Sequence, residues 1–136
     1  MKKIFLICVF IFFSCRKEGN LIYKFQGKYG PDVATLNLVE TDDKFYGTYE
    51  VFYGGNEKVK DSGKISGEKI GDTLKGKLTY VSYGGDEKTK PFILLKSGKN
   101  YKVGNGRISI LLGIPYYLPN TIKFDNSFIL KPVNNN

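Results

Sequence analysis

The sequence predicts an all-β fold: a small antiparallel up-and-down meander barrel of about eight strands, preceded by a cleaved signal peptide. Turn-forming residues recur about every ten positions after residue 20, which is typical of short strands joined by tight connections. Between these turns, hydrophobic and polar residues alternate with the period of a half-buried strand. The chain has 16 Gly and its aromatic residues are all Tyr or Phe, a composition that favours strands and turns over helices.

The first 14 residues have the pattern of an export signal. A basic start is followed by residues 4–13, an unbroken apolar run of ten residues. A transmembrane helix needs about 20 such residues, whereas ten suit the apolar region of a secretory signal. We therefore expect residues 1–14 to be removed, residues 15–20 to form a tether, and residues 21–136 to form the barrel domain.

Ser14-Cys15 closes the apolar run and resembles the lipobox of bacterial lipoproteins, although Phe12 stands where Leu is usual. In that family the peptide is cut before the Cys, which then carries diacylglycerol and an amide-linked acyl chain such as palmitate. The resemblance implies that Cys15 is the lipid attachment residue and that the protein contacts a membrane through this anchor. Arg16 follows in place of Asp, which by resemblance to the enterobacterial sorting rule favours the cell outer membrane, on its periplasmic face or at the surface. A plain signal peptide that happens to contain a Cys is the alternative.

The residue types needed for common catalytic sites are missing. The chain has no His, and its two cysteines are Cys8, within the predicted signal peptide, and Cys15. Cys–His and Ser–His–Asp catalysis, disulfides and Cys-based metal sites are therefore not expected in the mature protein. The acidic group Glu40, Asp42 and Asp43 is interpreted as turn-forming, with a carboxylate pair for glycoside hydrolysis or a weak calcium site as alternatives. We expect no enzyme activity, no catalytic residue, no cofactor and no metal.

The charge balance is basic. The formal net charge of +8 falls by two, to +6, when Lys2 and Lys3 are removed with the signal peptide. Most basic residues alternate with acids, as expected for a solvated strand face. An acidic glycan, an anionic lipid or an acidic protein would fit as a partner. Nucleic acid is not expected for an exported, tethered domain.

Alternation identifies the residues expected to face the barrel interior. In chain order they are Ala34, Leu36 and Leu38; Phe45, Gly47, Tyr49, Val51 and Tyr53; Leu74, Gly76, Leu78 and Tyr80; the apolar run 92–95; Ile108, Ile110 and Leu112; and Ile122, Phe124, Phe128 and Leu130. The interior glycines Gly47, Gly63 and Gly76 suit bends or bulges where the sheet curls. The triplet at residues 67–69 is read as a turn, and residues 103–107 give a hairpin signal.

A near-repeat, YGGNEKVK from Tyr53 and YGGDEKTK from Tyr83, is interpreted as the same hairpin turn used twice. Each Tyr would then face a Lys across its turn, namely Lys58 and Lys88. Because alternate turns of a meander lie at one end, these residues and the first turn predict a candidate binding rim of Tyr29, Tyr53, Lys58, Tyr83 and Lys88. Residues 113–120 are apolar but bounded by Pro, so we expect no strand centre there. They would form either a plug on the barrel end or an exposed contact loop.

Two families resemble the predicted barrel. FQGKYG, ATLNLVE, KFYGTYEVFYGG and YKVGNGRISIL are similar to the strand pattern of the N-terminal domain of the envelope lipoprotein NlpE and its lipocalin-like relatives, without the CxxC motif of that family. SGKNY is similar to the inhibitory loop of the membrane-bound lysozyme inhibitors, also without their paired cysteines. This second resemblance implies a candidate inhibitory loop at Ser97, Gly98, Lys99 and Tyr101.

Taken together, these patterns predict a membrane-anchored envelope lipoprotein with a binding or structural role, which recognises a ligand or partner through a barrel rim or surface loops. An inhibitor of a secreted enzyme such as lysozyme is one alternative, and a lipocalin-like carrier of a small ligand is another. An open or a packed barrel interior would distinguish the carrier from surface recognition.

Overall fold

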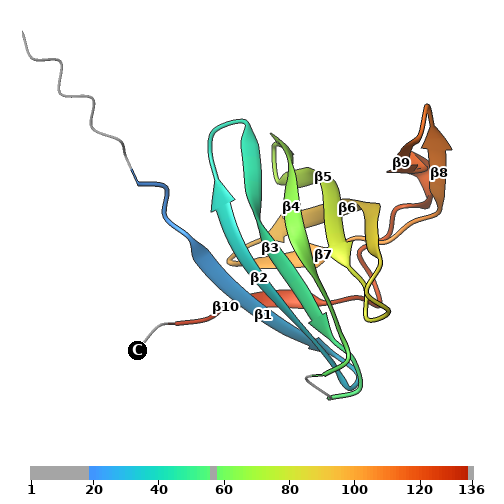
Figure 1. The fold of residues 1–136 in the computed structure, drawn as a ribbon. Helices are drawn as coiled ribbons and strands as arrows, with labels where there is room; N and C mark the ends of the chain where they lie inside the picture. Colours follow the sequence, from blue (N-terminus) through green and yellow to red (C-terminus); the bar gives the residue numbers. More distant parts are fainter. Residues whose placement is uncertain (1–18, 56–57, 135–136) are drawn as a thin grey trace, which may run out of the picture.

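The computed structural model describes residues 19–55 and 58–134, so the predicted signal peptide and Cys15 lie outside the described residues (Figure 1). The strands are β1 (Tyr23–Tyr29), β2 (Asp32–Glu40), β3 (Lys44–Phe52), β4 (Lys60–Ile70), β5 (Thr73–Val81), β6 (Glu87–Ser97), β7 (Asn100–Val103), β8 (Ile108–Leu111), β9 (Ile114–Tyr117) and β10 (Ile129–Pro132). A short 3₁₀ turn covers Pro119–Thr121. Within the described ranges, no helix is long and apolar enough to cross a membrane.

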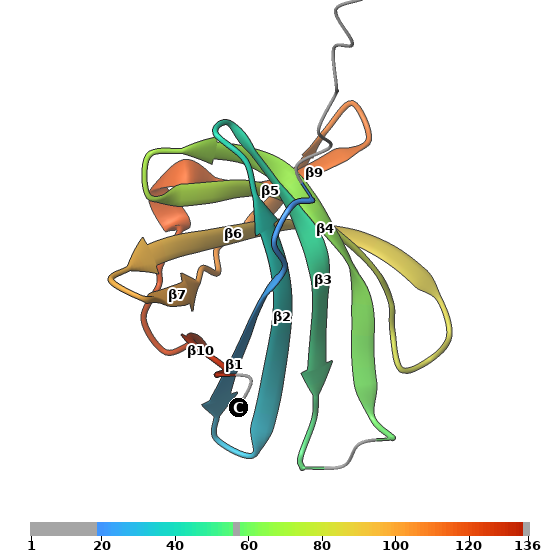
Figure 2. The same ribbon diagram turned by 90° about the vertical axis from the view of Figure 1, so that its left-hand side faces the viewer.

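Eight strands close into an antiparallel barrel in the order β1-β10-β7-β6-β5-β4-β3-β2, as the sequence predicted. From β1 to β7 each strand pairs with the next one along the chain, which is the meander expected from the short turns (Figures 1 and 2). The chain then leaves the barrel for the β8–β9 hairpin and returns as β10, which pairs with both β7 and β1. Closure thus depends on the last strand meeting the first.

The interior of the barrel is packed with most of the residues that alternation assigned to it, together with Phe25, Ile65, Tyr101 and Val103, which the sequence analysis had not assigned. Leu36, Leu38, Phe45, Leu74 and Leu94 are almost completely buried, and no charged or polar residue is buried among the described residues. Tyr49 and Phe92 pack with ring centroids 4.9 Å apart, and Phe25 meets Tyr101 edge-on at 5.0 Å. Tyr53, Tyr80 and Phe128 cover this core from its periphery.

Glycines allow neighbouring strands to approach closely where the barrel curls. A β-carbon at Gly76 would overlap the Ser66 carbonyl oxygen and would lie 2.7 Å from the Gly67 α-carbon. The expected turn at residues 67–69 is therefore wrong: these residues continue β4, and Gly67 pairs directly with Gly76. The chain turns at Gly71 instead, where φ is +60°.

The segment after β7 departs from the prediction. Ile108, Ile110 and Leu112 do not face the barrel interior, because β8 pairs only with β9 in a separate two-stranded sheet and all three residues are exposed. Residues 114–117 form β9, although Pro115 argued against a strand; Pro is tolerated here because the hairpin has free edges. Residues 103–107 make no hairpin, and residues 122–124 contribute only an isolated bridge from Lys123 to Asn105.

Candidate functional site

The two ends of the barrel differ. One end, here called the rim end, carries the β1–β2, β3–β4 and β5–β6 turns. The other end carries the β2–β3, β4–β5 and β6–β7 turns and opens into a pocket of about 870 Å³, here called the end pocket. Its apolar lining comprises Ile22, Tyr23, Phe25, Leu38, Tyr101, Pro132 and Val133, and its charged lining comprises Lys24, Glu40, Lys96 and Lys99.

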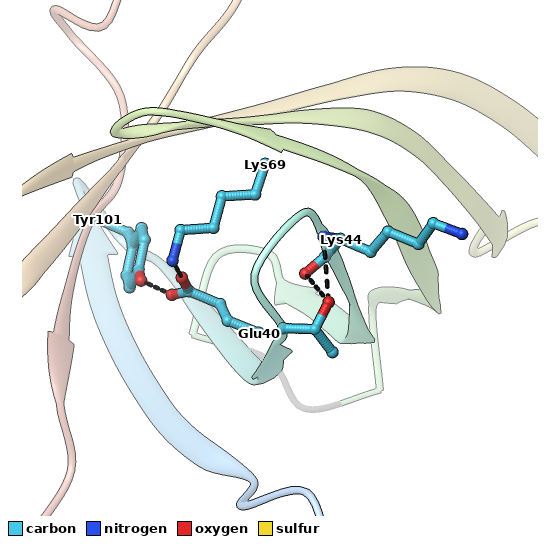
Figure 3. Close-up of polar contacts among 5 residues, drawn as sticks. Glu40, Lys44, Lys69 and Tyr101 are labelled. Atoms are coloured by element: carbon cyan, nitrogen blue, oxygen red, sulfur yellow. Dashed lines mark hydrogen bonds and ion pairs between the residues drawn. The ribbon is translucent and has the colours of Figure 1, made fainter.

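Glu40 stands at the centre of the polar contacts at this end (Figure 3). One carboxylate oxygen accepts a hydrogen bond from the Tyr101 hydroxyl, and the other lies 2.7 Å from the Lys69 ammonium nitrogen. The Glu40 and Lys69 side chains are only 19% and 29% exposed, so this ion pair is better shielded from water than a surface pair. The three residues come from β2, β4 and β7: only β3 separates Glu40 from Lys69 in the sheet, whereas Tyr101 meets Glu40 because the barrel closes.

The β2–β3 turn fixes the backbone around Glu40. The Lys44 amide donates to the Thr41 hydroxyl at 3.1 Å, and this hydroxyl donates to the Lys44 carbonyl at 3.2 Å (Figure 3). The Thr41 amide also donates to the Lys44 carbonyl, at 2.9 Å. The Lys69 amide donates to the Asp43 carbonyl at 2.9 Å, which ties this turn to the end of β4. Asp42 and Asp43 therefore belong to a turn, as expected, and no group of three or more His, Cys, Asp or Glu side chains that could hold a metal occurs in the described part of the chain.

The pKa values reflect this arrangement. Burial acts to raise the pKa of Glu40, but hydrogen bonds from Lys69 and Tyr101 and the charges of Lys69 and Lys96 outweigh it, so the pKa is lowered. Burial, followed by the hydrogen bond to Glu40 and its charge, raises the pKa of Tyr101. Glu40 is thus an anion at neutral pH and Tyr101 a neutral hydrogen-bond donor.

Lysines give the end pocket a positive potential. Because Lys69 compensates the charge of Glu40, the cations of Lys24, Lys96 and Lys99 remain without a further acid among the residues that line the pocket. The Lys96 ammonium lies 6.0 Å from the centroid of the Tyr101 ring, which directs this charge over an aromatic floor. An apolar floor bordered by cations suits a molecule with an apolar body and an anionic head group.

The candidate inhibitory loop lies beside the same pocket. Ser97 and Asn100 pair at the base of the β6–β7 turn, Gly98 adopts φ +62°, and Gly98 and Lys99 line the pocket. Tyr101 is only 2% exposed and points toward Glu40, so it does not project from the surface with Lys99. The structure therefore places Gly98, Lys99 and Tyr101 in the wall of the pocket, whereas Ser97 lies at the base of the turn outside the lining.

The candidate rim residues also gather at one end, although the predicted Tyr–Lys pairs across the turns are wrong. Tyr29 packs edge-on against Phe128 at 6.1 Å, whereas Tyr83 lies within the β5–β6 turn and is 67% exposed.

The strand register shows which residues face one another beside these turns. Val81 pairs with Glu87, so the β5–β6 turn is longer than two residues and Lys88 faces Tyr80. Lys58 is exposed in the β3–β4 turn, and the Tyr53 amide bonds to the Val59 carbonyl instead. Cations do lie over rings nearby, but they are Lys60 over Phe52 and Lys90 over Tyr80.

Two carboxylates that the sequence analysis missed hold the rim together. Asp61 accepts from the Tyr53 hydroxyl at 2.8 Å and from the Tyr83 amide at 3.1 Å. Asp32 accepts from the Gly54 amide at 2.8 Å. Burial, together with Asp61, raises the pKa of Tyr53. These bonds join the two copies of the near-repeat to one another, and their residues lie too far apart in the sequence for any local motif to reveal them.

The rim end is nearly closed. A cavity of only about 110 Å³ remains among Tyr49, Tyr53, Lys90, Tyr117 and Phe128, together with smaller neighbours. Tyr117 on β9 and Phe128 before β10 thus cover the barrel at this end, which is the plug that was one of two alternatives for residues 113–120. The tip of the same segment is instead exposed, with Ile114 at 68%.

Comparisons with protein-family models, with curated proteins and with solved structures found no match to this chain.

Proposed function

We propose that this protein is a lipid-anchored binding protein of the bacterial envelope, attached through Cys15, that binds an amphipathic anion in the end pocket. The binding role is supported by an apolar pocket floor bordered by the cations of Lys24, Lys96 and Lys99. The negative charge of Glu40 in the same pocket is already neutralised by its ion pair with Lys69. A ligand of this class would place its apolar body on Phe25, Leu38 and Tyr101 and its anionic head near the lysines. The same chemistry belongs to a fatty acid, a phospholipid or an acylated glycan phosphate.

Binding in the end pocket is favoured over carriage deep within the barrel. The centre of the barrel is filled by side chains such as Leu36, Phe45 and Leu94, each at most 1% exposed. A lipocalin-like carrier would need that volume for its ligand. The end pocket offers space without disrupting this packing, because its floor is the outer layer of the same core.

A pair of single-chain amphiphiles that differ only in head-group charge tests the proposal. The full chain is titrated by calorimetry with dodecyl phosphate and with dodecyltrimethylammonium, each below its critical micelle concentration. We expect saturable binding of the phosphate and much weaker binding of the ammonium compound. Equal affinity for both, or no binding of either, would contradict the proposed ligand class.

Two lysine variants locate the site. Lys96→Gln with Lys99→Gln should weaken dodecyl phosphate binding about fivefold, since each partly exposed ion pair contributes only a fraction of a tenfold change in affinity. Lys75→Gln with Lys77→Gln removes the same number of charges on β5, outside the pocket lining, and serves as the matched control that should leave the affinity unchanged. An equal effect of the control would indicate non-specific charge attraction.

The anchor has its own test. Cells that express the protein are labelled with an alkyne-tagged palmitate and separated by detergent phase partition. The natural chain should carry the label and enter the detergent phase, whereas Cys15→Ala should do neither. A labelled Cys15→Ala protein, or an unlabelled natural one, would remove the lipoprotein interpretation and leave the pocket assay unaffected.

A further inference from the structure

The β8–β9 hairpin exposes an unusual group of aliphatic side chains. Ile110, Leu111, Leu112 and Ile114 are 69%, 64%, 93% and 68% exposed and surround a two-residue turn. The hairpin projects from the barrel as a separate small sheet (Figures 1 and 2). Large contiguous apolar groups are uncommon on a free surface and indicate a contact with another apolar phase.

The hairpin turn places Leu112 in a backbone conformation that is unfavourable for its side chain. Leu112 and Gly113 both have positive φ, 50° and 78°, as in the type I′ turn that normally carries Asn-Gly. A side chain such as Leu is unfavourable in this left-handed region. Stability alone would favour Asn at residue 112, so an aliphatic residue at the most exposed position of the tip indicates a functional role.

The stretch of sequence that contains the hairpin is basic. Residues 88–124 contain no Asp or Glu, yet they contain seven basic residues, two of which are Arg107 and Lys123. Both of these are exposed and lie at the base of the hairpin, where Leu118 donates to the Arg107 carbonyl and Lys123 bridges to Asn105. This segment therefore complements an anionic surface.

Along the hairpin the order is an aliphatic tip, then Tyr116, then the basic residues of the base. Segments that sit in a bilayer interface have the same order, with aliphatic groups in the acyl region, aromatic rings near the head groups, and cations against anionic lipid. A protein partner would explain the apolar tip, but it would not require this order of chemistry from tip to base.

One flat membrane surface can contact both the hairpin and the start of the described chain. The described chain begins at Gly19, and both this start and the hairpin lie toward the top of the two views, which share a vertical axis (Figures 1 and 2). Leu21 and Ile22, each 70% exposed, lie just after that start. The β5–β6 turn, which carries Tyr83, lies below the hairpin in both views.

We propose that the tip of the β8–β9 hairpin inserts into an anionic lipid bilayer, and that this contact is separate from any lipid anchor and from the end pocket. Ile110, Leu111, Leu112 and Ile114 enter the acyl region, and Arg107 and Lys123 meet the phosphate groups. The contact fixes the orientation of the barrel on the membrane, which a flexible tether by itself does not do.

The absence of Trp from the chain allows a direct test. Ile114→Trp introduces a single fluorophore at the hairpin tip, and Tyr83→Trp introduces one at an equally exposed site on the rim end. Each full chain is mixed with phosphatidylcholine vesicles that contain phosphatidylglycerol and acyl-brominated lipid. We expect the indole at the hairpin tip to shift its emission to shorter wavelength and to be quenched by the brominated chains, and the indole at the rim end to remain unquenched. Equal quenching at the two sites, or none at the hairpin tip, overturns the proposal.

A substitution at the turn separates insertion from folding. In the Ile114→Trp background, Leu112→Asn suits the positive φ and should keep or raise the denaturant midpoint, yet it should lower quenching by bromolipid several-fold. Unchanged quenching would contradict insertion of the tip. A blue shift that needs no lipid and grows with protein concentration would show self-association of the hairpin and also overturn the proposal. Dodecyl phosphate binding to the Leu112→Asn chain should be unchanged, so the pocket and the hairpin fail or succeed independently.

Discussion

At the scale of single residues, Glu40 is the group whose surroundings most constrain its charge. Its carboxylate is held by Lys69 and Tyr101, and its pKa is lowered from an ordinary value of 4.5. A carboxyl group with a lower pKa in the folded state stabilises that state fully above its unfolded pKa. This contribution is lost as the pH falls through the folded value, because the unfolded chain takes up the proton first.

Glu40→Gln should therefore lower the free energy of unfolding by about 1 kcal/mol at pH 7, a modest value because both members of the ion pair keep some contact with water. The difference between the natural chain and the variant should shrink as the pH is lowered below 4.5. Urea unfolding at a series of pH values from neutral to acid measures it. Glu87→Gln, an exposed carboxylate on β6, is the control and should show a small difference throughout. A difference for Glu40→Gln that stays constant with pH would contradict the ion pair.

The same residue shows the limit of sequence reasoning. Alternation placed Leu36 and Leu38 correctly in the core, and Asp42 and Asp43 were correctly read as turn residues, whereas Glu40 is the last residue of β2 and not part of the turn. Glu40 pairs with Tyr101, which is 61 positions away in the sequence, and with Lys69 on another strand. No local sequence pattern can reveal side-chain contacts between different strands and turns, so the end pocket and the Asp61 bonds at the rim were not predicted.

At the scale of elements, glycine determines how tightly the strands of the barrel can curl. The sequence suggested bends or bulges at Gly47, Gly63 and Gly76, but the β4–β5 register continues without interruption past Gly63 and Gly76. The glycines act by close approach: a β-carbon at Gly47 would overlap the Asn37 carbonyl oxygen. Such contacts with backbone cannot be relieved by moving a side chain.

Gly76→Ala should accordingly destabilise the protein by about 2–3 kcal/mol, since its methyl group would meet the backbone of residues 66 and 67. Gly84→Ala is the matched control, because an added β-carbon there has no atom within 4 Å. It should be neutral or slightly stabilising through the lower entropy of the unfolded chain. Equilibrium urea denaturation followed by tyrosine fluorescence gives both values. Similar midpoints for the two variants would disprove the close approach of β4 and β5.

The β8–β9 hairpin shows why residues 108–112 were wrongly predicted to face the barrel interior. Ile108, Ile110 and Leu112 alternate as a half-buried strand should, and alternation was the only signal available. In the structure one side of this strand contributes to no core, and its aliphatic groups are exposed. Patterning identifies which residues share a face, but it does not identify whether the apolar phase beside that face is the protein interior.

At the scale of the whole molecule, the fold is held together by the contact between its two ends. The meander from β1 to β7 is made of neighbours in sequence, but the barrel closes only where β10 lies between β7 and β1. Leu130 on β10 is completely buried in the common core, and Phe128 packs against it from the edge. Loss of β10 would leave two unpaired strand edges and an open core.

A chain that ends after Asn126 should therefore lose cooperative unfolding altogether. Burial of Leu130 alone contributes about 2–4 kcal/mol, a large part of the roughly 5–15 kcal/mol that stabilises a typical domain, and the unpaired edges of β1 and β7 add to the loss. Near-ultraviolet circular dichroism of the tyrosines and thermal melting would follow the change. A chain that ends after Asn134 keeps every described strand and should melt as the natural protein does. If the shorter chain kept a sharp transition near the natural midpoint, the meander from β1 to β7 would be stable without closure, and the terminal strand would serve only to cover an edge.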